Sequence, residues 1–118
     1  MAGSRVVAVI DDDAAVLQSL KFLLETAGHT VAAYGSATDF LDDHVSRPAC
    51  LIVDQHMPVM TGLELVARLR QEAAEVPVLL ITGSPTSAIA ARANELGVAM
   101  LEKPPAEHDV LTFIDEHV

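Results

Sequence analysis

The chain has 118 residues, a length that suits one domain built around one core. Hydrophobic residues make up 51% of it and aromatic residues only 3%, which excludes a disordered chain and predicts a core of aliphatic side chains. A net charge of −10 with no cluster of Lys or Arg argues against direct nucleic-acid binding.

The sequence also bears on location. No apolar run approaches the roughly 20 residues that a membrane-crossing helix needs, and no signal peptide is visible at the start. The single cysteine, Cys50, excludes an internal disulfide and is interpreted as a small buried residue. We therefore expect a cytoplasmic protein with no membrane partner. Residues 1–4 are expected to be a tail, and residues 5–118 the domain.

The first half of the chain predicts two strands and two helices. Residues 5–10 form a β-branched apolar run typical of a strand buried on both faces, and residues 30–34 give a second strand. Between them, apolar residues recur at helical spacing until the pattern ends near Gly28. Ser36 begins a short helix, with Asp39 three residues later as in a capping box.

The second half continues the alternation. Further apolar runs predict strands at 50–53, 77–81 and 98–101. Thr61 and Glu64 have capping-box spacing and open a helix. Ser84, followed by a proline, is expected to be the N-cap of a helix that runs to about residue 96. A last helix covers about 106–117.

Five strands that alternate with five helices predict an α/β fold. The connections should be right-handed crossovers, giving a parallel sheet covered by helices on both faces. We expect the doubly wound, flavodoxin-like arrangement with strand order 2-1-3-4-5. In such a sheet, ligands bind beyond the carboxyl ends of the strands.

Polar residues stand at four of these five strand ends. They are Asp11 and Asp12 after the first strand, Asp54 after the third, Thr82 after the fourth and Lys103 after the fifth. Three carboxylates packed together repel one another, and a hard divalent cation such as Mg²⁺ relieves that repulsion. An ammonium and a hydroxyl beside them suit phosphoryl oxygens, and aspartate is a known phosphoryl acceptor. The pattern therefore predicts phosphoryl transfer at a magnesium site.

Four motifs resemble the signatures of two-component receiver domains. They are Val9–Asp13, Val53–Pro58, Ile81–Gly83 and Glu102–Pro104. The resemblance covers the chain from about residue 5 to its end, and it is strongest to the nitrogen-fixation-regulator branch. Receiver domains are signalling domains that catalyse only their own phosphorylation and dephosphorylation.

The resemblance implies a role for each residue at the strand ends. Asp54 would accept the phosphoryl group, and Thr82 and Lys103 would contact it. Asp12 would bind Mg²⁺ directly and Asp11 mostly through water, together with Asp54 and the backbone carbonyl of His56. The Lys103–Pro104 peptide bond would be cis.

The resemblance also implies partners and an output. The donor would be a histidine kinase or a phosphotransfer protein. Output would use the face formed by the fourth helix, fifth strand and fifth helix, with homodimerisation on phosphorylation as one form. Thr82 would be part of the switch, but Met100 stands where the family usually has Tyr or Phe. The switch aromatic is therefore missing.

Two alternatives stay open from the sequence. The first is an interaction module that signals without phosphorylation, which only Met100 supports. The second is a phosphatase of the haloacid dehalogenase kind, because Asp11 and Asp13 have the one-residue gap of that family. Against it, Ala15 replaces the Thr or Val expected two residues after Asp13, and the chain has no room for a cap.

Overall fold

The computed structural model describes residues 6–43, 48–72 and 74–118. The predicted tail, residues 1–4, lies outside the described residues. The strands are β1 (Val6–Ile10), β2 (Thr30–Tyr34), β3 (Cys50–Asp54), β4 (Val78–Thr82) and β5 (Ala99–Glu102). The helices are α1 (Ala14–Thr26), α2 (Ala37–Asp42), α3 (Gly62–Gln71), α4 (Ser87–Glu95) and α5 (Glu107–His117).

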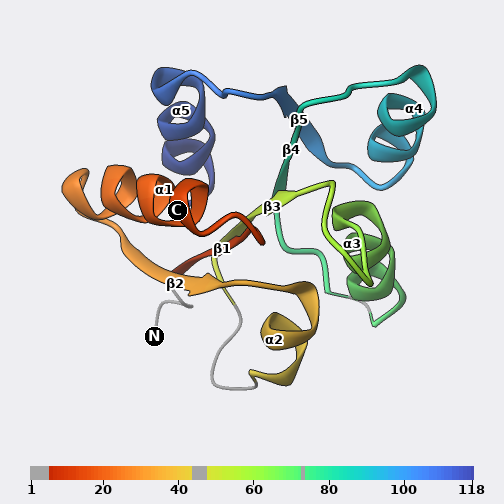
Figure 1. Ribbon diagram of the computed structural model, residues 1–118, viewed down its shortest axis with the longest axis horizontal. Coiled ribbons are helices and arrows are strands. Elements are labelled where there is room, and N and C mark those ends of the chain that lie inside the picture. Colours follow the sequence, from red (N-terminus) through yellow and green to blue (C-terminus); the bar gives the residue numbers. More distant parts are fainter. Residues whose placement is uncertain (1–5, 44–47, 73) are drawn as a thin grey trace.

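The strands form one parallel sheet in the order β2-β1-β3-β4-β5, which confirms the predicted topology. Helices α1 and α5 cover one face of the sheet, and α2, α3 and α4 cover the other (Figure 1). Because every strand runs in the same direction, the carboxyl ends of β1, β3, β4 and β5 meet at one edge.

Two apolar clusters hold the helices against the sheet. Alternate residues of the central strands point to opposite faces, so Val53 packs toward α3 while its neighbour Ile52 packs toward α1 and α5. Strands β3 and β4 are buried at every position. The site residues at their ends are therefore fixed by the rigid centre of the molecule.

The helix starts mostly follow the predicted caps. The Ser36 side chain accepts a hydrogen bond from the Asp39 backbone N–H, and both bonds of the Thr61–Glu64 capping box are present. The predicted N-cap at Ser84 is wrong. Thr86 caps α4 instead, its hydroxyl accepting from the backbone N–H of Ile89, while the Ser84 N–H turns back to the Thr82 hydroxyl.

Cys50 begins β3 in the centre of the sheet and is fully buried. Burial raises the pKa of its thiol to about 11. Since the thiolate is the reactive form, this cysteine is protected both by the fold and by its protonation state. The prediction of a small buried residue is confirmed.

Arg70 joins the end of α3 to the end of α4. Its guanidinium donates to the carbonyls of Ala74 and Val76 after α3, at 2.9 and 3.0 Å, and to the carbonyl of Leu96 at 3.1 Å. Leu96 is the C-cap of α4, so this side chain satisfies backbone acceptors that a helix end leaves unpaired.

Among the described residues, no helix combines the length and apolar character needed to span a bilayer.

Tyr34 at the end of β2 gives a pH prediction. Its hydroxyl donates to Asp43 at 2.6 Å. Burial, followed by this bond and the charge of Asp43, raises the Tyr34 pKa from 10.0 to about 12. The neutral phenol is favoured in the fold, so the contribution to stability is fully present below pH 10.0 and is lost as the pH rises toward 12.

Tyr34 is the only tyrosine and the chain has no tryptophan, so phenolate absorbance reports this group alone. We expect the absorbance titration of the Tyr34 phenol in the folded protein to have its midpoint near pH 12. Asp43→Asn removes the negative charge and should move the midpoint back toward the ordinary value. A midpoint of 10.0 in the folded wild-type protein would contradict the account.

Candidate phosphoryl and metal site

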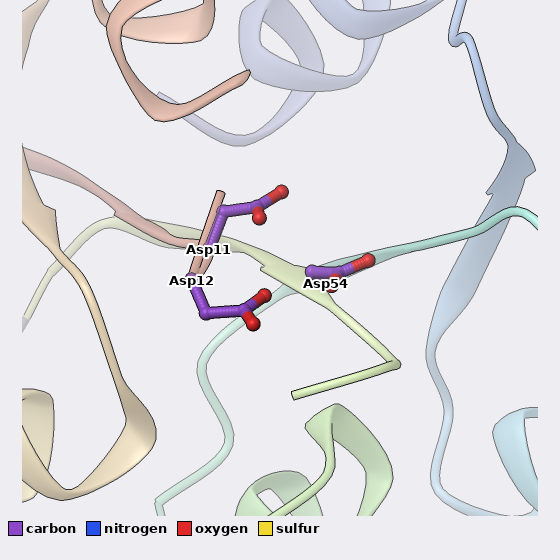
Figure 2. Close-up of side chains that lie close together, drawn as sticks. All are labelled: Asp11, Asp12 and Asp54. Atoms are coloured by element: carbon purple, nitrogen blue, oxygen red, sulfur yellow. The ribbon is translucent and has the colours of Figure 1, made fainter. Parts of the chain in front are cut away.

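Three carboxylates gather at the carboxyl edge of the sheet. Asp11 and Asp12 follow β1 directly, and Asp54 is the last residue of β3. One ligand oxygen from each lies within 4.8 Å of the others. Figure 2 shows the three side chains extending to the same side of the strand ends. Asp11 and Asp54 are buried, whereas Asp12 is exposed, so the cluster opens to solvent on the Asp12 side.

Lys103 supplies the positive charge. Its Nζ lies 2.8 Å from Oδ1 of Asp54 and 3.7 Å from Oδ2 of Asp11. Burial by itself lowers the Lys103 pKa, but contact with Asp54 and the charges of the nearby aspartates outweigh it and hold the pKa above its ordinary value. The side chain therefore stays an ammonium in contact with the carboxylate of Asp54.

The charges of the site do not balance. Burial, with a contribution from the negative charge of Asp54, raises the Asp11 pKa, although the Asp13 backbone N–H donates to Asp11 Oδ1 at 2.9 Å and partly offsets this. Oδ1 of Asp54 is fully buried and, apart from the Lys103 ammonium, has no hydrogen-bond partner among the described residues. One ammonium thus faces three carboxylates.

This donor set fits a hard divalent cation. Carboxylate oxygens are the ligands that Mg²⁺ prefers, and a few of them on an open edge leave positions for water or phosphoryl oxygens. A cation here would supply the positive charge that the site lacks and would reverse the rise in the Asp11 pKa. The donor chemistry of Asp11, Asp12 and Asp54 therefore agrees with the expected magnesium site.

Thr82, the last residue of β4, is the remaining strand-end residue of the predicted site. Its side chain is fully buried, and its Oγ1 lies 3.0 Å from Nε2 of His56 and 3.1 Å from the Ser84 backbone nitrogen. His56 stands two residues after Asp54. The resemblance to receiver domains implied a metal-binding role for the His56 backbone carbonyl, and the contact of its imidazole with Thr82 was not predicted.

Asp13 lies outside the acidic cluster. Its carboxylate caps α1 and accepts from the backbone N–H groups of Ala15 and Val16. An aspartyl phosphatase of the predicted alternative kind needs Asp13 as a partner of Asp11 at the reacting centre. The structure groups Asp11 with Asp12 and Asp54 instead, so the geometry gives that alternative no support.

The loop after β3 is held by residues that carry no charge. Gln55 is buried, and its side-chain carbonyl accepts from the Leu63 N–H at 2.9 Å, which fixes the start of α3. Gly62 packs so closely that a Cβ there would lie 2.7 Å from the Asp54 carbonyl oxygen and 2.7 Å from the Leu80 side chain. Both residues fix the segment between Asp54 and α3, and neither was assigned a role of its own from the sequence.

Val59, in the same loop, adopts a φ of 71° and is 95% exposed. This conformation is strained for a β-branched residue, whereas Asn tolerates it. Since Val59 has almost no packing to lose, Val59→Asn should stabilise the fold by about 1 kcal/mol. We expect a higher urea midpoint at unchanged m-value. Val59→Ala is the control, and it should gain less because Ala is also disfavoured at positive φ. An Asn midpoint at or below wild type would contradict the prediction.

The remaining predicted residues lie on and after β5. Met100 is half-buried and packs against the apolar cluster on the α2, α3 and α4 face. The Lys103–Pro104 peptide bond is cis. An apolar groove of about 520 Å³ runs from Lys103 and Pro104 between α1 and the start of α5.

Comparison with known proteins agrees with this geometry. Residues 7–115 match the family described as response regulator receiver domain. The chain is 43% identical over 106 residues to the transcriptional regulatory protein FixJ of Azorhizobium caulinodans, covering 88% of this chain and 50% of that protein. It is 37% identical over 114 residues to the response regulator protein TodT of Pseudomonas putida, covering 94% of this chain and 50% of that protein.

Solved structures show the same fold. The crystal structure of FixJ-N has a TM-score of 0.86 at 31% identity and covers 100% of this chain and 98% of that one. A CheY-like receiver domain protein of Methanospirillum hungatei has a TM-score of 0.88 at 25% identity, covering 96% and 92%. The chain spans about half the length of the curated relatives it matches.

Proposed function

Because this chain belongs to the response regulator receiver domain family, we propose that it is the phosphoacceptor switch of a two-component system, with Asp54 as the acceptor. The observation that carries the proposal is the contact of the Asp54 carboxylate with Lys103 beside Asp11 and Asp12. A histidine kinase or a phosphotransfer protein is the proposed donor.

The proposed reaction is one phosphoryl transfer. An oxygen of the Asp54 carboxylate forms a bond to phosphorus as the N–P bond of a donor phosphohistidine breaks, and the imidazole that leaves takes up a proton. Lys103 and the Thr82 hydroxyl then contact phosphoryl oxygens. These residues position the group and neutralise its charge, which is the main contribution of proteins to such transfers.

Asp11, Asp12, Asp54 and the His56 carbonyl are the proposed magnesium ligands. When bound, the cation supplies charge stabilisation for the transferring phosphoryl oxygens. Asp12 is exposed at the open side of the cluster and is the ligand that a cation entering from solvent would meet first. Asp11, buried behind it, would act on the cation mainly through its charge and through water.

Signal output is proposed to use the α4-β5-α5 face, with homodimerisation as one form. Thr82 pairs with Glu102 across the β4-β5 ladder, and Leu80 pairs with Met100. A shift of Thr82 toward a phosphoryl group would therefore bear directly on β5. A flexible Met100 can repack in response where an aromatic ring would rotate.

The test uses the chain with a small phosphodonor. Incubation with acetyl phosphate and Mg²⁺ should add the mass of one phosphoryl group, located by peptide mapping to the segment that contains Asp54. Chelation of the metal should prevent the addition. Absence of any adduct would contradict the proposal and would favour the phosphorylation-independent module, whereas steady hydrolysis of generic phosphomonoesters would favour a phosphatase.

A further inference from the structure

The Thr82 hydroxyl has two neighbours in a buried setting. The Ser84 backbone N–H donates to its oxygen at 3.1 Å, and Nε2 of His56 lies 3.0 Å away. No other hydrogen bond of this hydroxyl occurs among the described residues. A hydroxyl has a single proton to donate and two lone pairs to accept with. The direction of the Thr82–His56 bond therefore decides where that one proton points.

The burial of Thr82 favours one direction for this bond. If His56 donated through Nε2, the hydroxyl proton would be buried without an acceptor, because both neighbours would be donors. Buried donors in proteins are almost always paired. The arrangement that pairs all of these groups sends the hydroxyl proton to Nε2, and it requires the imidazole to carry its own proton on Nδ1.

We infer that His56 is a positioning residue whose imidazole holds the Thr82 proton until a phosphoryl group on Asp54 takes it. This inference rests on the proposed function, since it assumes a phosphoryl oxygen as the competing acceptor. Both acceptors need the same proton, so the bond to His56 favours the unphosphorylated arrangement. A ligand that binds only the arrangement in which the Thr82 proton points to the phosphoryl group must therefore break the bond to His56.

The size of the effect follows from one hydrogen bond. Removing the imidazole acceptor should favour the phosphoryl-bound arrangement by about threefold to tenfold, the range that corresponds to a net hydrogen bond. The ring is exposed and makes no other side-chain bond among the described residues. Its replacement is therefore not expected to disturb the fold.

Two variants separate the acceptor from the bulk of the ring. His56→Phe keeps a ring without an acceptor, and His56→Gln keeps a side-chain oxygen that can accept. The probe is beryllium fluoride with Mg²⁺, a stable phosphoryl mimic, whose affinity is measured for each protein. We expect His56→Phe to bind it threefold to tenfold more tightly than wild type, and His56→Gln to remain within about twofold.

A second readout starts from the free protein, before the mimic is added. Imidazole ¹⁵N shifts of wild type, recorded in mildly alkaline buffer, should show a proton on Nδ1 of His56 and none on Nε2. Beryllium fluoride should then perturb the Nε2 signal as Thr82 turns away. A proton on Nε2 in the free protein, or a His56→Phe affinity equal to wild type, would overturn the inference. Failure of acetyl phosphate to modify the protein while the tautomer is as expected would refute the proposed function instead.

Discussion

Asp54→Asn is expected to abolish phosphorylation of this chain by acetyl phosphate. The amide has no negative oxygen to attack phosphorus, and Asp54 is the carboxylate that contacts the Lys103 ammonium at 2.8 Å. The measurement is intact mass after incubation with Mg²⁺. Wild type should gain one phosphoryl group, and the variant none.

Asp13→Asn is the matched control for that variant. It makes the same chemical change two residues after Asp11, but at the N-cap of α1, where Asn caps as well as Asp. We expect the Asp13→Asn protein to gain one phosphoryl group, as wild type does. A full adduct on the Asp54→Asn protein would show that another side chain is the acceptor.

Lys103→Met is expected to slow phosphorylation of Asp54 by about 10²–10³-fold, the usual cost of losing one group that stabilises developing charge. Methionine keeps an unbranched side chain, one atom shorter, and removes the ammonium. The variant also leaves the carboxylates of Asp11 and Asp54 without the Lys103 ammonium that lies close to both. The initial rate of adduct formation at fixed acetyl phosphate and Mg²⁺ measures the effect.

Lys21 provides the control, since it is the only other lysine in the chain. It lies on α1 and makes no ion pair among the described residues. Lys21→Met should therefore phosphorylate at the wild-type rate. Equal rates for both lysine variants would remove Lys103 from the proposed mechanism.

Much of this fold could be predicted because its signals are local. Buried strands give continuous apolar runs, and a sheet of parallel strands brings their ends together whatever the loops do. Asp11 and Asp54 could be found in this way because each directly follows such a run, and Lys103 because it lies two residues after one. The Ser36 and Thr61 caps have equally local signatures.

The features that were missed depend on packing between segments. Nothing in the sequence near Val59 indicates a positive φ, because valine is a residue that avoids it. The three carbonyls that Arg70 binds come together only after α3 and α4 have packed. Ser84 has the chemistry of a cap, but the Thr82 hydroxyl takes its N–H and the helix begins at Ser87.

The buried Cys50 makes this chain convenient for fluorescence spectroscopy. Because its thiol is both inaccessible and protonated, maleimide dyes should ignore it in the native protein. A single exposed replacement such as Ala91→Cys on α4 would then carry one dye at one known place, without first removing the native cysteine. Any movement of that helix on phosphorylation would then become visible as a change in emission.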